Sequence, residues 1–465
     1  MFSINNLISK TLIIFPLFLI SCSCSNPEAK VTPVIIVPPV VVTPKPENEL
    51  LDLVEKDALK YFWDYAQSNS KLARERYHTD DIGNDANIVT TGGSGFGLMT
   101  ILVGIQRGFV NREEAITRLN TALTFLEQAD RFHGAWSHWI DGNTKHVIPF
   151  STKDNGGDLV ETSFLCQGLI CVREYFKNGT DAEKALAQKA DDLWKGVEWD
   201  WYTKGGENVL YWHWSPNYNW DMNFKLEGYN ECLLTYVMAA ASPTHTISAT
   251  PYTQGWSRNG GIVSGGSSYG FPKIFNYNGT GSVGPMFWAH YSYLGLDPRG
   301  LSDQFANYWT LTQNHAKIML AYCVANPKSY KDYSDKCWGL TASYTRNADG
   351  SQGYSAHQPN NDRGVISPTA ALSNYPYTPV ESLKFLRYLY EENKDKYVGV
   401  AGPYDAFSPQ YNNWVTKRYL AIDQGTIVPM IENHRTGMLW NLFMNAPEIK
   451  SGLIKLGFSS SQHGF

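Results

Sequence analysis

Residues 111–126, NREEAITRLNTALTFL, contain a complete signal for an amphipathic helix. Asn111 and Glu114 have the spacing of a capping box, in which two side chains satisfy backbone N–H groups at the start of a helix. Behind them, apolar residues recur on one helical face, namely Ala115, Leu119, Leu123 and Leu126. The stretch therefore predicts a helix with one buried face.

The same signals repeat outward along the chain. Apolar residues from Glu49 to Tyr65 keep to one helical face, and Thr180 with Glu183 repeats the capping box. Thr378 precedes a proline at the first helical position, where proline is favoured. Further helices are predicted at about 97–107, 158–177, 228–241, 284–295, 302–325, 367–373, 424–434 and 437–446. Hairpin signals are few.

About twelve helices joined by long loops rich in Trp, Gly and Asn suit an all-α (α/α)6 toroid, with six inner and six outer helices. The chain has 465 residues, of which 43% are hydrophobic, and this supports a large core. We find no second linker, so we predict one domain over residues 49–465. The loops at one end of the ring would hold the site.

The first 48 residues are predicted to form an export signal followed by a tether. Lys10 precedes the apolar run 11–20, which is too short to span a bilayer but suits an export signal over residues 1–21. Leu19-Ile20-Ser21-Cys22 resembles a bacterial lipobox, which implies a lipid on Cys22; an ordinary signal peptide is the alternative. Residues 22–48 would form a Pro/Val-rich tether. We expect an exported lipoprotein, periplasmic or on the cell surface, and a monomer.

Charge and residue spacing restrict the partner and the cofactor. The net charge is −5 with no long basic run, so nucleic acid and acidic polysaccharides are disfavoured. A neutral oligo- or polysaccharide remains, with membrane contact only through the lipid. The eleven histidines show no ligand spacing such as H-E-x-x-H. We therefore expect no metal and no cofactor.

Carboxylates gather at predicted helix starts. Asp158 and Glu161 lie one turn apart with Asp154 in the loop before them, although helix capping explains Asp158 and Glu161 equally well. Glu231 opens an apolar helix, where burial penalises its charged form and favours a general acid. Asp423 also precedes an apolar stretch and is either functional or an N-cap. Glycoside cleavage needs one protonated carboxyl and one ionised carboxylate.

Aromatic residues in loop-like contexts would supply sugar-stacking surfaces, although many such rings only pack loops. Together with polar residues of the acid-rich segments, they form the predicted substrate-binding set: Trp136, Trp139, His213, Trp256, Tyr293, Trp338, Asp405, Glu432 and Arg435.

These segments, in this order, resemble the glycoamylase-like family of exported bacterial proteins. The motifs that carry the resemblance are Gly134-Ala-Trp-Ser-His-Trp139, Asp158-Leu-Val-Glu161-Thr-Ser, Tyr229-Asn-Glu231, His290-Tyr-Ser-Tyr293, Trp338-Gly-Leu-Thr-Ala-Ser343, Asp405-Ala-Phe407, Ile422-Asp-Gln-Gly425, Ile431-Glu-Asn433 and Arg435-Thr-Gly437. Together they extend from about residue 50 to 448.

The resemblance implies the six-fold toroid and is greatest to glycoside hydrolase family 144, whose members cleave β-1,2-glucan with inversion. It implies that Glu231 is the general acid and places Asp154, Asp158, Glu161 and Asp423 in the acidic cleft, with Asp423 as first choice for the base.

Three other functions stay open from the sequence. A non-catalytic, surface-anchored glycan-binding lipoprotein would explain the anchor and the tryptophans, but not the acids at so many helix starts. A glucoamylase-type hydrolase would keep the carboxylates and change the linkage. A polysaccharide lyase on the same toroid would need basic residues to neutralise a uronate, and few lie beside His138, His213 or His434.

Overall fold

The computed structural model describes residues 44–465, and Lys45–Phe465 form one compact unit. The predicted signal peptide, Cys22 and the tether as far as residue 43 lie outside the described residues. Within residues 44–465, no helix combines the length and apolar character that a membrane crossing requires.

Most predicted helices are present, but α2 begins about six residues earlier than predicted, α6 and α7 begin five or six residues later, and α10 and α13 were not predicted. Asn111 accepts hydrogen bonds from the backbone N–H groups of Glu113 and Glu114, and Thr180 with Glu183 forms a reciprocal capping box. The helices are α1 (Glu47–Trp63), α2 (Thr91–Gln106), α3 (Arg112–Gln128), α4 (Leu159–Phe176), α5 (Asp181–Lys195), α6 (Leu233–Ala241), α7 (Tyr308–Ala325), α8 (Pro368–Leu372), α9 (Pro379–Arg387), α10 (Lys394–Tyr397), α11 (Ala421–Arg435), α12 (Met438–Met444) and α13 (Pro447–Lys455).

The predicted helix at 284–295 is instead two short 3-10 helices, η4 (Met286–Ala289) and η5 (Tyr291–Leu294). They are separated at His290, whose Nε2 lies 2.9 Å from the Asn374 side-chain oxygen. Asn374 is 84 residues away in sequence, so no local pattern predicts this contact.

The chain is largely helical, as predicted, and the described residues also form eight small antiparallel sheets. Several pair strands that are far apart in sequence, so no hairpin signal marks them. The sheets are β1 (Arg76–His78) with β16 (Arg418–Leu420), β2 (Ile88–Thr90) with β3 (Trp139–Asp141) and β4 (Val147–Ile148), β5 (Gly157–Asp158) with β6 (His213–Trp214), β7 (Ser267–Ser268) with β8 (Phe271–Pro272), β9 (Leu301–Ser302) with β17 (Ser459–Ser460), β10 (Ala342–Arg346) with β11 (Gln352–Ala356), β12 (Val398–Gly399) with β13 (Gly402–Pro403), and β14 (Phe407–Ser408) with β15 (Trp414–Val415).

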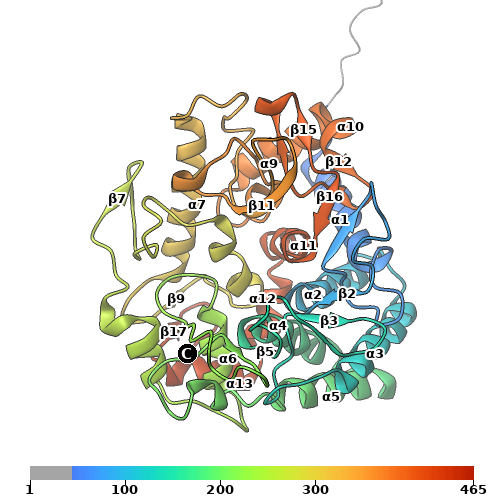
Figure 1. The fold of residues 1–465 in the computed structure, drawn as a ribbon, viewed down its shortest axis with the longest axis vertical. Coiled ribbons are helices and arrows are strands. Elements are labelled where there is room, and N and C mark those ends of the chain that lie inside the picture. Colours follow the sequence, from blue (N-terminus) through green and yellow to red (C-terminus); the bar gives the residue numbers. More distant parts are fainter. Residues whose placement is uncertain (1–43) are drawn as a thin grey trace, which may run out of the picture. The chain divides into compact units, whose positions relative to one another are not determined.

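Two kinds of helix build the core. Helices α2, α4 and α11 are buried over most of their length, and α2 packs against both of the others. Figure 1 shows α11 end-on, with α2 and α4 close by. Helices α3 and α5 instead bury one stripe and expose charged residues, as expected of helices on the outside of the core.

Helices α2 and α4 approach closely because glycine faces glycine. A Cβ atom on Gly95 would collide with the backbone of Phe164 and Leu165, and one on Gly168 would collide with the backbone of Gly95. Neither clash is relieved by rotating a side chain, because the obstacles are backbone atoms. This contact sets the spacing of the two helices that carry Gly92 and Asp158.

We expect Gly95→Ala to lower the free energy of unfolding by roughly 1–3 kcal/mol, because the added methyl overpacks a rigid contact. Chemical denaturation followed by circular dichroism measures the change. Gly265→Ala is the matched control, since nothing lies within 4 Å of a Cβ added there. Equal stability of the two variants would contradict the close-packing argument.

Candidate active site

The N-terminal ends of several helices meet at one cluster of acidic side chains. The backbone N–H of Gly92 in α2 donates to Glu161 Oε2 of α4 at 2.7 Å. The Tyr291 hydroxyl of η5 donates to Asp423 Oδ1 of α11 at 3.2 Å, and the Thr369 hydroxyl of α8 donates to the backbone carbonyl of Asp423 at 2.7 Å. Helices distant in sequence therefore place their first turns together.

Asp158 joins α4 to the neighbouring loops. Its Oδ1 accepts the backbone N–H of Glu161 at 2.9 Å and so caps the helix, while its Oδ2 lies 3.0 Å from His138 Nδ1. His213 Nε2 lies 3.4 Å from Asp154 Oδ2 and 3.8 Å from Asp158 Oδ2. Strand pairing of β5 with β6 brings His213 to this position. The capping and functional interpretations of Asp158 are thus compatible.

An ion pair between Asp158 and His138 sets the protonation states of both groups. Burial opposes protonation of His138, but the negative charges of Glu161 and Asp158 outweigh it and raise the histidine pKa to about 10. Burial likewise opposes ionisation of Asp158, yet the hydrogen bond from His138 and the nearby His213 lower its pKa. At neutral pH, Asp158 is therefore an anion and His138 a cation.

The remaining carboxyls of this group hold their protons more tightly. Burial and the Asp158 charge raise the pKa of Asp154 to about 7. Burial raises the pKa of Glu161 to about 7, with Asp158 adding to the shift and His138 opposing it. Burial and Asp158 also raise the pKa of Glu231 to about 7. Several carboxyls can thus give or take a proton near neutrality.

Asp405 and Asp423 form a second carboxyl pair. Asp405 Oδ2 accepts the Tyr344 backbone N–H at 2.8 Å, whereas the buried Oδ1 of Asp405 and the buried Oδ2 of Asp423 have no hydrogen-bond partner among the described residues. Burial and the Asp405 charge raise the pKa of Asp423 well above its usual range, and burial raises the pKa of Asp405 to about 6. The pair shares one proton at neutral pH.

Glu75, a buried carboxylate just before β1, belongs to the same cluster although the sequence did not single it out. Its charge acts on His138, Glu161 and Asp423. Glu75 lies between two arginines in sequence and has no capping or helical pattern around it, so no local signal distinguishes it from a surface acid.

A small cation is geometrically conceivable beside Asp158. Ligand atoms of His138, Asp154 and Asp158 lie within 4.8 Å of one another. Such an ion would have to displace the His138 proton, whose pKa of about 10 reflects the same two anions that would bind the metal. In the structure, the protonated His138 already balances the negative charge of Asp158.

Comparison with known proteins identifies the family. The glycoamylase family model, described as "putative glucoamylase", matches residues 223–447. The structure of an endo-β-1,2-glucanase from Chitinophaga pinensis, in complex with sophorotriose and glucose, is 54% identical with a TM-score of 0.86, covering 90% of this chain and 99% of that chain. The chain belongs to the glycoamylase-like family. The resemblance read from the sequence is confirmed.

One further relative and one structural neighbour of low identity were also found. An exo-β-1,2-glucooligosaccharide sophorohydrolase from Parabacteroides distasonis is 42% identical over 433 residues, which are 89% of this chain; the chain spans 58% of that relative's length. An endo-β-1,2-glucanase from Talaromyces funiculosus is 11% identical with a TM-score of 0.59, covering 88% of this chain and 92% of that one, and supports the fold alone.

Most tryptophans predicted to stack on sugar are core residues of this glycoamylase-like chain, which corrects that expectation. Trp136, Trp256 and Trp338 are fully buried. The Trp136 indole donates to the Leu126 carbonyl at 3.1 Å, and Trp256 stacks on Tyr252 with ring centroids 5.5 Å apart. Tyr293 is buried as well. Polar neighbours in sequence concealed that these rings pack loops onto helices.

Other aromatics do lie beside the acid cluster. Trp139, predicted from the sequence, is partly exposed and contacts Phe150, whose ring also lies 4.2 Å from His138. Phe224 contacts Trp212 at 5.3 Å. Phe150 is 48% exposed and Phe224 51% exposed, so both offer apolar faces next to the acids. The predicted substrate-binding set contained no phenylalanine, so it missed both rings.

The prediction that Glu432 and Arg435 bind substrate at this site is also corrected. They lie near the end of α11 remote from Asp423, about 14 Å along the axis for Glu432 at the usual helical rise. Glu432 pairs with Arg107 at 2.7 Å, and Arg435 pairs with Glu55 at 2.5 Å. These ion pairs fasten α11 to its neighbours.

We expect the His138 ring to remain protonated from pH 6 to pH 9, because two anions stabilise its cation. In Asp158→Asn, loss of one anion should lower that pKa measurably. NMR titration of labelled histidine measures the His138 pKa in the unmodified chain and in Asp158→Asn. The His138→Gln variant assigns the signal. A His138 signal that titrates below pH 8 in the unmodified chain would contradict the proposed charge pair.

Proposed function

We propose that this chain is a glycoside hydrolase that cleaves β-1,2-glucan, with Glu231 as the general acid. The observation that carries the proposal is the position of Glu231, which lies two residues before the first residue of α6, where burial and the Asp158 charge act on its carboxyl. Its raised pKa of about 7 keeps a large fraction protonated near neutrality. The β-1,2 linkage is that of the bacterial relatives.

We propose that the Asp405–Asp423 pair is the base. Tyr291 lies between the two sides of the site, because its hydroxyl donates to Asp423 and its pKa responds to the charges of both Asp423 and Glu231. Above pH 6 the pair carries one negative charge and can take a proton from water attacking the sugar carbon. The two carboxyls act together as the base, since one of them is ionised and the other protonated at neutral pH.

In the inverting mechanism, Glu231 protonates the glycosidic oxygen as the bond to the sugar carbon breaks. Water attacks that carbon from the opposite face and loses its proton to the Asp405–Asp423 pair. Asp158 and His138 neutralise each other, while Gly92 donates to Glu161 and His213 lies beside Asp154. Exposed Phe150 and Phe224 would stack on sugar faces.

For the architecture, we propose the (α/α)6 toroid. The inner ring would comprise α2, α4, α6, the η4–η5 segment, α8 and α11, since their first turns gather around the acids. Helices α3, α5, α7 and α9 would belong to the outer ring. The six-hairpin closure explains why catalytic groups alternate with long stretches that contribute none.

We further propose that the enzyme is exported and anchored by a lipid on Cys22, with residues 22–48 as the tether of a catalytic domain at 49–465. The support is the lipobox-like spacing and the proline-valine composition. A surface or periplasmic enzyme would meet its glucan outside the cytoplasm. The monomeric state stays a prediction.

Glu231→Gln should reduce turnover of β-1,2-glucan by at least about a thousandfold, because the amide cannot supply the proton, while binding persists. Chromatography of products from a panel of neutral glucans measures turnover. The matched control is Glu227→Gln, four residues earlier and exposed, which should retain activity.

The panel also separates the alternatives. Products from α-1,4-glucan alone would indicate a glucoamylase-type enzyme. Unsaturated products from uronate polymers would indicate a lyase. Retention of glucan without any product would identify a glycan-binding lipoprotein.

The pH dependence of kcat/KM should be bell-shaped, with limbs at about 6 and about 7. Activity falls below the first limb because the Asp405–Asp423 pair gains a second proton, and above the second because Glu231 loses its own. Asp405→Asn should move the low-pH limb and leave the high-pH limb in place. A rate that stays flat from pH 6 to pH 9 would refute the assignment.

A further inference from the structure

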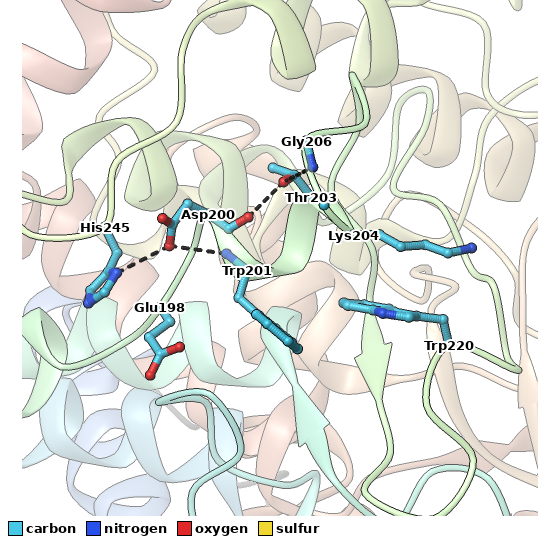
Figure 2. A pocket seen from close by; sticks show the side chains of 9 residues that line it. Glu198, Asp200, Trp201, Thr203, Lys204, Gly206, Trp220 and His245 are labelled. Atoms are coloured by element: carbon cyan, nitrogen blue, oxygen red, sulfur yellow. Dashed lines mark hydrogen bonds and ion pairs between the residues drawn. The ribbon is translucent and has the colours of Figure 1, made fainter.

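A second aromatic surface lies outside the acid cluster. Nine residues, all between Glu198 and His245 in sequence, line a surface pocket of about 810 Å³. This volume suits a small organic ligand. Trp201 is 40% exposed and Trp220 is partly exposed. Figure 2 shows the Trp201 ring between a polar end with Asp200 and His245 and an end with Trp220 and Lys204.

Strand β6 separates this pocket from the acids. Successive side chains of a strand point to opposite faces. His213 points to Asp154, at 3.4 Å, whereas Trp214 points the other way, with its ring 6.2 Å from that of Trp201. The pocket and the acid cluster therefore lie on opposite faces of one short strand.

The structure holds the Trp201 ring firmly. The residue opens a 3-10 turn capped by the Asp200 side chain, and its neighbours Trp199 and Tyr202 are fully buried. One face of the ring stacks on His133, with centroids 3.6 Å apart. A ring fixed in this way loses little conformational entropy when a ligand stacks on it.

The two indoles make one platform. Their ring centroids are 6.4 Å apart and the planes are inclined by 32°. This separation leaves no room for a sugar between the rings, so a ligand would lie across them. Asp200 is 55% exposed in its side chain and faces His245 at 3.2 Å, which places a carboxylate and an imidazole beside the apolar surface.

We propose that this pocket is a second saccharide-binding site, which takes a neutral sugar of the polymer while another part of the same chain lies at the acid cluster. An apolar platform flanked by a carboxylate, an imidazole and the Lys204 ammonium matches a sugar ring, which has apolar faces and a hydroxylated edge. The ligand rests on the proposed function, since we take β-1,2-glucan to be that polymer.

The test is electrophoresis in native gels with and without β-1,2-glucan, in the Glu231→Gln background so that the polymer is not cleaved. Trp201→Ala and Trp220→Ala should each weaken retardation by the glucan roughly tenfold, because each removes buried apolar contact. Tyr175→Ala is the matched control, a partly exposed aromatic at the other end of α4 from Asp158. Thermal melting verifies that each variant is folded.

A second measurement separates this site from the catalytic cleft. With Glu231 intact, Trp201→Ala should cleave short β-1,2-oligosaccharides at the unmodified rate and show a raised KM for the polymer only. Unchanged retardation in both tryptophan variants would overturn the proposal, and so would lost cleavage of the short substrates. Retardation that depends on Trp201 without any hydrolysis would leave the second site standing and reject the proposed function.

Discussion

The arrangement of the site depends on the two carboxylate oxygens of Asp158, which make two different contacts. One oxygen caps α4 through the Glu161 backbone N–H, and the other holds the protonated His138. An anion at a helix N-terminus is stabilised by the unpaired N–H groups there. The residue that fixes where α4 begins therefore also provides a negative charge that adds to the effect of burial in raising the pKa values of Asp154, Glu161 and Glu231.

Crowding of carboxyls at helix starts is costly for stability but useful for proton transfer. Buried like charges cannot all ionise, so protons are retained near neutral pH. Here the retention takes two forms: single carboxyls around an ion pair, and the Asp405–Asp423 pair with one proton between two groups. The close packing of α2 on α4 at Gly95 keeps these groups from relaxing apart.

Local sequence signals predicted the helices well because caps and apolar stripes act within a few residues. Asn111 and Thr180 are found at helix starts as predicted, and acids at predicted helix starts do meet in space. The failures share one cause, which is dependence on distant contacts. Trp136 has polar neighbours in sequence but a buried ring in the fold, and His290, at the break between η4 and η5, contacts Asn374, which is 84 residues away in sequence. Glu75 has a role only through its position beside groups remote in sequence.

Strand β6 contributes one residue to the acid cluster and one to the tryptophan pocket. Because side chains alternate, its two residues must face opposite ways: His213 toward the acids and Trp214 toward the tryptophan pocket. Its register against β5 is fixed by pairing with Gly157 and Asp158. A shift of one residue would turn His213 away from Asp154 and disturb both faces together. The same backbone pairing thus places His213 beside Asp154 and Trp214 beside Trp201, so it holds the acid cluster and the tryptophan pocket on opposite faces of one strand.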